Sequence, residues 1–136
     1  MSISLLRRKA SMESIRLTNL DISVGTAERD ADNIEVEFKA EGRLLQHGER
    51  PDAKKLLMSI NVESPNNDYY DIEAVAEAIF VFAEDADEEY LATYMSRYAP
   101  NEVVGFLRSY LASATAVFPY GAVDLPGFNI TLDLAN

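Results

Sequence analysis

Cysteine and tryptophan are absent from the 136 residues, and histidine occurs once. Without cysteine the chain forms no disulfide, no thiolate metal site and no cysteine nucleophile. Six glycines and five prolines are spread singly, so no glycine-rich phosphate loop is present. The longest uncharged run extends from Ser109 to Val123 and contains Pro119. This run is too short to span a bilayer, and we expect a cytoplasmic protein without membrane insertion.

Positive charge is scarce, because 12 Lys and Arg residues stand against 23 Asp and Glu residues, a net charge of −11. Nucleic acids and anionic membranes attract basic proteins, so neither is an expected partner. No Lys or Arg lies between Lys55 and Arg97. This stretch is a solvated face, a docking surface for a basic partner or a calcium site. The calcium site is disfavoured, because an EF-hand loop starting at Asp85 would place Tyr90 at its glycine and Ser96 at its glutamate.

Hydrophobic residues make up 48% of the chain, which is enough for one packed core at this length. The basic residues concentrate near the start, because residues 1–16 contain Arg7, Arg8, Lys9 and Arg16 and only one acid, Glu13. We therefore divide the chain into a short basic segment, residues 1–13, and a single domain, residues 14–136.

Alternation of apolar and polar residues predicts two regular β-strands. From Asn33 to Ala40 it is strict, and one side carries Ile34, Val36 and Phe38. Residues 58–62 repeat the pattern after a turn. Both strands suit an antiparallel sheet with one face in water.

Two further segments are less regular. Residues 14–24 change their apolar side near Thr18, which indicates a strand with a bulge. Tyr69 to Phe82 fits either a strand or an alanine-rich helix, and its β-rich end favours the strand.

Two helices are expected after this strand. Asp85 or Asp87 can cap the first, which Pro100 ends. Asn101 can cap the second, which ends at Phe118. Strands followed by helices indicate an α+β fold.

Catalytic chemistry finds little support in the sequence. The single histidine, His47, lies in a turn with Gly48 and Pro51, and no Gly-x-Ser-x-Gly elbow accompanies it. Paired carboxylates are expected by chance in so acidic a chain. We therefore expect a protein that is not an enzyme and carries no cofactor or metal.

Three segments follow one another in the second half of the chain: Tyr98-Ala99-Pro100-Asn101, Phe118-Pro119 and Leu125-Pro126-Gly127-Phe128-Asn129-Ile130. In this order they resemble the SecB family of protein-export chaperones. Upstream, residues 20–24 resemble the family's first strand, and residues 78–80 resemble the end of its fourth. The order of these pieces matches over residues 14–131.

This resemblance implies a four-stranded antiparallel sheet with helices packed on one face. It also implies a homodimer or homotetramer that holds unfolded or preprotein clients in apolar grooves without ATP. Such a protein needs accessible apolar surface together with charge against self-association. The SecA motor or another basic partner would dock on an acidic sheet face.

The resemblance assigns residues to each of these roles. The client-binding groove would be formed by Ile34, Val36, Phe38, Phe80, Phe82, Tyr94 and Tyr98. The partner-docking acids would be Asp21 and Glu73. The family's second acid in the first strand falls on Gly25, its segment after the Pro-Asn pair is replaced by residues 103–106, and its long C-terminal helix is missing. An adaptor of the same fold, assembling with one specific protein partner, is therefore the alternative function.

Overall fold

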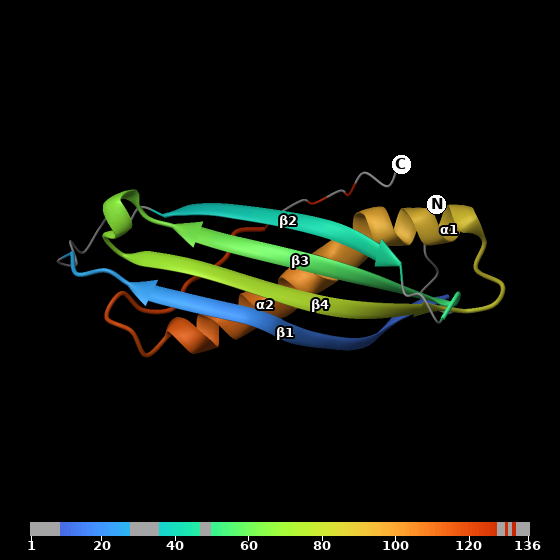
Figure 1. Cartoon of the computed structure of the whole chain (residues 1–136), viewed down its shortest axis with the longest axis horizontal. Helices are drawn as coiled ribbons and strands as arrows, with labels where there is room; N and C mark the ends of the chain where they lie inside the picture. Colours follow the sequence, from blue (N-terminus) through green and yellow to red (C-terminus); the bar gives the residue numbers. More distant parts are fainter. Residues whose placement is uncertain (1–8, 28–35, 47–49, 128–129, 131, 133–136) are drawn as a thin grey trace.

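The computed structural model describes residues 9–27, 36–46, 50–127, 130 and 132. Four antiparallel strands form one sheet in the order β1-β4-β3-β2, with helices on one face (Figure 1). The predicted α+β arrangement is therefore confirmed. The elements are β1 (Ala10–Val24), β2 (Glu37–Gln46), β3 (Ala53–Glu63), the 3-10 turn η1 (Pro65–Asn67), β4 (Tyr70–Phe82), α1 (Glu88–Thr93), the π-helical turn η2 (Tyr94–Tyr98) and α2 (Ala99–Thr115).

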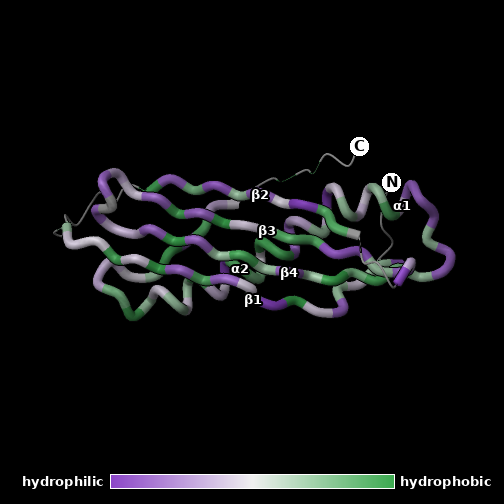
Figure 2. Tube along the Cα trace, viewed as in Figure 1, coloured by the Kyte–Doolittle hydropathy of each residue, from purple (hydrophilic) through white to green (hydrophobic). Residues whose placement is uncertain are grey.

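β4 is a central strand, with β1 on one side and β3 on the other. Its even-numbered residues are buried on the inner face, toward the helices, and its odd-numbered residues lie on the outer face. Figure 2 shows this alternation as green and purple residues along the strands. The strand predicted for this segment is confirmed. Three inner alanines at its centre, Ala74, Ala76 and Ala78, are 0% exposed and leave room for α2 to pack closely.

The pairing of β1 with β4 shifts at two places, the second between Leu17 and Asn19. Leu17 and Leu20 both pair with inner-face alanines of β4, because Thr18 is the extra residue between these pairs. The bulge predicted near Thr18 is confirmed. The strand begins at Ala10, earlier than the predicted residue 14.

β2 forms the opposite edge of the sheet, and its pairing with β3 is uninterrupted. It continues to Gln46, beyond the predicted end at Ala40. Gly42 lies on the inner face, opposite Met58 of β3. Residues 33–35 of the predicted strand, including Ile34, lie outside the described residues.

The helical region corrects the sequence prediction. Asp87, one of the two predicted caps, accepts a hydrogen bond from the Tyr90 N–H at 2.8 Å and starts α1. The chain then stays helical through η2 and into α2, so Pro100 does not end a helix and Asn101 does not cap one. Pro100 lies in the first turn of α2, directly after the π-helical turn, where its fixed φ suits a helix and its missing N–H costs one helical hydrogen bond.

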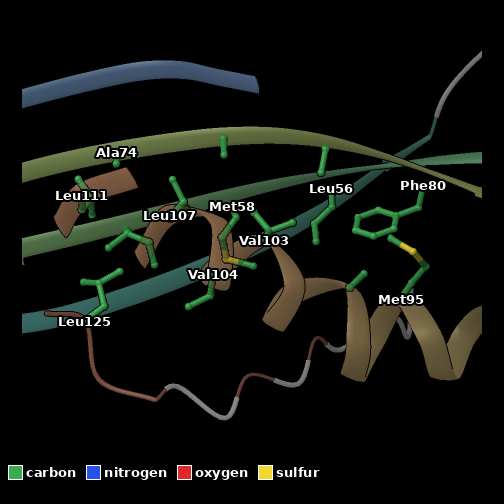
Figure 3. Packing of buried hydrophobic residues seen from close by; sticks show 14 of the residues in the cluster. Leu56, Met58, Ala74, Phe80, Met95, Val103, Val104, Leu107, Leu111 and Leu125 are labelled. Carbon is green, nitrogen blue, oxygen red and sulfur yellow. The ribbon is translucent and has the colours of Figure 1, made fainter. Parts of the chain in front are cut away.

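The core lies between the inner face and one side of α2. α2 buries Val103, Val104, Leu107 and Leu111 against β3 and β4, and Met95 of η2 packs near Phe80 (Figure 3). Beyond α2 the chain turns back, and Leu125 covers the other end of this core.

A buried threonine holds the turn after α2 in place. The Thr115 hydroxyl donates to the Leu111 carbonyl at 2.6 Å and accepts from the Val123 N–H at 2.7 Å. The Thr115 hydroxyl and the Val123 N–H are thus both hydrogen-bonded within the protein, as buried polar groups generally are.

Candidate functional site

Four of the predicted groove residues pack into one aromatic cluster. The Tyr94 ring centroid lies 5.9 Å from those of Phe80 and Phe82 and 5.9 Å from that of Tyr98. Phe80, Phe82 and Tyr94 are 0%, 8% and 4% exposed, whereas Tyr98 is 39% exposed. In this structure only Tyr98 of the cluster offers a large accessible surface.

Val36 and Phe38, the described groove residues of the β2 end, lie far from this cluster. Phe38 pairs with Val62, and Val62 pairs with Ile72 of β4. Phe80 is eight residues further along β4, which corresponds to about 27 Å of strand. The predicted groove residues therefore form two groups at opposite ends of the inner face, and their role in client binding stays a prediction.

The chain's own C-terminal part lies between these two groups. We name its described residues, Ile130 and Leu132, the strap. Both are half-buried and pack against the core. Gly42 marks the middle of β2, and a Cβ placed on it would lie 2.8 Å from one Leu132 methyl carbon and 3.4 Å from the other. The strap thus covers the centre of the inner face beside β2.

Two polar groups of the helical layer hold the strap. The Asn101 amide nitrogen donates to the Ile130 carbonyl at 3.2 Å, and the Ile130 N–H donates to the Asn101 amide oxygen at 3.4 Å. The Leu132 N–H donates to the Ser96 carbonyl at 2.9 Å. Sequence reasoning missed Asn101 in this role, because a helix cap and a backbone clamp use the same residue type.

The outer face carries the two predicted docking acids. Asp21 of β1 and Glu73 of β4 are directly opposite each other in the antiparallel pairing. Like charges in this position destabilise a sheet. Asn19 donates to one Glu73 carboxylate oxygen at 2.9 Å, and no ion pair with Asp21 occurs among the described residues. The structure brings the two acids together, and their docking role stays a prediction.

More acids surround this pair than the sequence interpretation named. Asp71 pairs with Glu63, and Glu63 pairs with Glu37, all on the outer face. A hollow of about 280 Å³ is lined by Asp21, Ser23, Asn61, Glu63, Asp71, Ile72 and Glu73. We name the six outer-face acids of this end the acidic half, and they are Asp21, Glu37, Glu41, Glu63, Asp71 and Glu73. The two-residue period of each strand is the signal that could have identified the additional acids.

The acidic half contains one described cation, Lys39, whose amine lies 3.8 Å from Glu63. The other half of the outer face is different, because its acid is neutralised by neighbours. Glu77 lies 3.1 Å from Arg16 and 3.7 Å from Lys55. Along the strand direction, the outer face therefore has an acidic half at one end and a half toward the other end where Glu77 is paired with cations.

Arg50 joins the two acids Glu13 and Asp52 at one end of the sheet, with N–O distances of 2.6 and 3.5 Å. The hydrogen bond that Arg50 donates to the Glu13 carboxylate is the main reason that the pKa of Arg50 is raised above its ordinary value. Arg50 is thus a cation that is paired with two acids at this end of the sheet.

The described residues add no support for a metal site or a membrane-spanning helix, and they do not include the single histidine. His47 lies outside them. Within them, no three histidine or acidic residues are placed to hold a metal ion. No helix in the described ranges is long and apolar enough to cross a membrane.

Comparisons with known proteins support the fold. No family model matches the chain, and no curated protein matches it. Among solved structures, it is similar to the SecB-like chaperone Rv1957 of Mycobacterium tuberculosis, in complex with a ChAD peptide from the HigA1 antitoxin Rv1956. The TM-score is 0.69 at 18% identity, over 88% of each chain. A protein of unknown function from Streptococcus agalactiae aligns with a TM-score of 0.48 at 9% identity, over 86% of this chain and 96% of that one. With its four-stranded sheet and one-sided helical layer, the chain has the SecB-like fold.

Proposed function

We propose that this chain is an ATP-independent cytoplasmic chaperone, a holdase that binds unfolded polypeptides, preproteins for export among them, on the inner face of its sheet. The observation that carries the proposal is the incomplete cover of that face. Inner residues of the edge strands are only half-buried, and they are Met12, Ile15, Leu17, Leu20, Ile22 and Val24 of β1, Phe38, Ala40 and Leu44 of β2, and Val36 directly before β2. An unfolded client offers the apolar side chains that such a surface binds.

The dimensions of the elements explain why the cover is incomplete. α2 has 17 residues and is about 26 Å long. β4 has 13 residues and is about 44 Å long, and the sheet has four strands. α2 crosses behind the sheet diagonally (Figure 1), so parts of both edge strands are left without a helix over them, as their half-buried inner residues show.

The similarity to Rv1957 supports the proposal from another side. That SecB-like chaperone was solved with an antitoxin peptide bound. The same fold can thus accommodate a polypeptide segment, and we infer the same ligand class for this chain.

Two adjacent leucines of β2 give a matched test. Leu44 lies on the inner face opposite Leu56, whereas Leu45 lies on the outer face opposite Lys55, and both are half-buried. The probe is fluorescently labelled α-lactalbumin, reduced and carboxymethylated so that it stays unfolded, without ATP. We expect Leu44→Ser to weaken binding about tenfold, which corresponds to about 1.4 kcal/mol of apolar contact. Leu45→Ser should leave affinity unchanged.

Circular dichroism and urea unfolding establish that both variants are folded before binding is compared. Equal affinities for the two folded variants would show that the inner face is not the binding surface. A folded wild-type protein that neither binds the probe nor suppresses aggregation at stoichiometric amounts would overturn the proposed function.

The partly open edge strands also underlie a proposed assembly. We propose a homodimer or homotetramer, in which a second copy covers an edge of the sheet and leaves the inner face to the client. Light scattering should give a multiple of 15.1 kDa at micromolar concentration. A monomer mass would contradict this assembly.

The acidic half favours a second function, in which the protein docks a specific basic partner such as the SecA motor. Opposed acids in a sheet cost stability, and partner binding is a reason for a protein to keep them. We expect Asp21→Asn with Glu73→Gln to weaken binding of a lysine-rich peptide severalfold at low salt. An unchanged affinity would argue against docking at this face.

A further inference from the structure

The strap is held through its backbone as well as through its apolar side chains. Asn101 offers its amide oxygen to the N–H and its amide nitrogen to the carbonyl of one residue, Ile130, the same two contacts that a neighbouring β-strand would offer. Its second amide hydrogen bonds the Arg97 carbonyl at 2.7 Å and fixes the side chain on α2. Hydrogen bonds of this kind bind the backbone of an extended peptide whatever its side chains are.

Pro100 creates the second backbone contact. In an α-helix the Ser96 carbonyl would accept a hydrogen bond from the N–H of residue 100, and proline has no N–H. The carbonyl is left to face the strap, where the Leu132 N–H donates to it at 2.9 Å. The proline that sequence reasoning took for a helix end therefore supplies an acceptor for an extended chain.

Gly42 completes the contacts of the strap, because its missing side chain leaves room for Leu132. A Cβ at this position would approach Leu132 to 2.8 Å and the terminal methyl of Met58 to 2.9 Å. A side chain here would therefore displace the leucine. The absence of one from Gly42 leaves a seat on the inner face for a branched apolar residue.

We propose that Asn101, Ser96 and Gly42 form a binding site for an extended apolar polypeptide, and that the strap occupies this site as an internal competitor which a client displaces. The site lies between the two groups of predicted groove residues, so a client crossing the inner face beside β2 meets it. The strap fills it with two half-buried residues, Ile130 and Leu132, and with backbone hydrogen bonds that another extended chain can replace. The client part of this inference rests on the proposed function.

The first test uses a synthetic peptide of residues 127–136 and does not depend on any client. Leu132→Asp in the full chain should release the strap, because a carboxylate is disfavoured in the apolar seat. The peptide should then bind this variant at least tenfold more tightly than it binds the wild type. Adding Asn101→Ala should remove that binding. Equal binding to wild type and Leu132→Asp, or binding that survives Asn101→Ala, would overturn the site.

The second test locks the strap. Because the chain has no cysteine, Gly42→Cys with Leu132→Cys creates the only possible intramolecular disulfide, at a place where a Cβ added to Gly42 would meet the Leu132 side chain. We expect oxidation to weaken binding of unfolded α-lactalbumin at least tenfold and reduction to restore it. Leu132→Cys alone, treated in the same way, is the control.

The outcomes separate the two proposals. Equal client affinity in the oxidised and reduced forms would overturn the competitor role of the strap. Peptide binding to Leu132→Asp without client binding by any variant would overturn the holdase function and support the site.

Discussion

Glu73 and Glu77 occupy the same face of the same strand, and their neighbours predict opposite effects of one substitution. Glu73 faces Asp21 and accepts a hydrogen bond from Asn19. Glu77 lies between Arg16 and Lys55. Glutamine preserves the shape and the acceptor oxygen of either side chain and removes only the charge. We expect Glu73→Gln to stabilise the protein and Glu77→Gln to destabilise it.

The magnitudes follow from the charges. Two carboxylates about 6 Å apart in water repel by about 0.7 kcal/mol, and moderate salt reduces this to about half. Glu73→Gln should therefore raise the free energy of unfolding by about 0.5 kcal/mol. Glu77 is 16% exposed and loses two partly solvated ion pairs, so Glu77→Gln should lower it by about 1 kcal/mol.

Urea unfolding at low salt measures both variants against the wild type. The difference between the variants, about 1.5 kcal/mol, exceeds the error of comparing midpoints at a common m value. In 1 M NaCl both shifts should shrink, because the screening length falls to about 3 Å. A Glu73→Gln variant that is as unstable as Glu77→Gln would refute the idea that the acidic half is held under repulsion.

Three further substitutions test the packing of the helical layer. Thr115→Val leaves the buried Val123 N–H without its acceptor and should lower unfolding free energy in urea by about 1–3 kcal/mol. Asp87→Ala removes the cap that accepts from the Tyr90 N–H, and the same measurement should show a loss of about 1 kcal/mol, with no loss counting against the cap. Ala76→Leu adds three carbons where exposure is 0% and should cost about 1–3 kcal/mol, seen as a lower melting temperature. An unchanged melting temperature would mean that α2 does not pack closely on this alanine.

Residue patterns with a short period predicted the sheet well. Alternation placed β3, the β-rich end of residues 69–82 favoured the strand that is β4, and the change of apolar side in residues 14–24 located the bulge at Thr18. Asp21 and Glu73 came from the family resemblance, and the register puts them opposite each other. These features depend on the pleat of a strand, which fixes the face of each residue from local sequence alone.

Features that depend on contacts between residues far apart in the chain were not predicted from the sequence. Pro100 has the same local signal whether it ends a helix or begins the next one, and here the π-helical turn continues into α2. The link from Asn101 to Ile130 spans 29 residues and leaves no local pattern. The separation of Phe38 from Phe80 follows from the register of three strands, which single-sequence reasoning does not fix.

The bulges of β1 have a consequence for the edge of the sheet. β1 uses 15 residues to pair with the 13 residues of β4, so it carries two residues that a regular strand would not need. Removing Thr18 would leave Leu17 and Asn19 on their present faces, because the alternation continues across the gap. The extra residues serve the edge instead: they interrupt the row of backbone donors and acceptors that a foreign strand would need for a continuous ladder. If the protein binds unfolded polypeptides as proposed, this edge would thereby be protected from joining their aggregates.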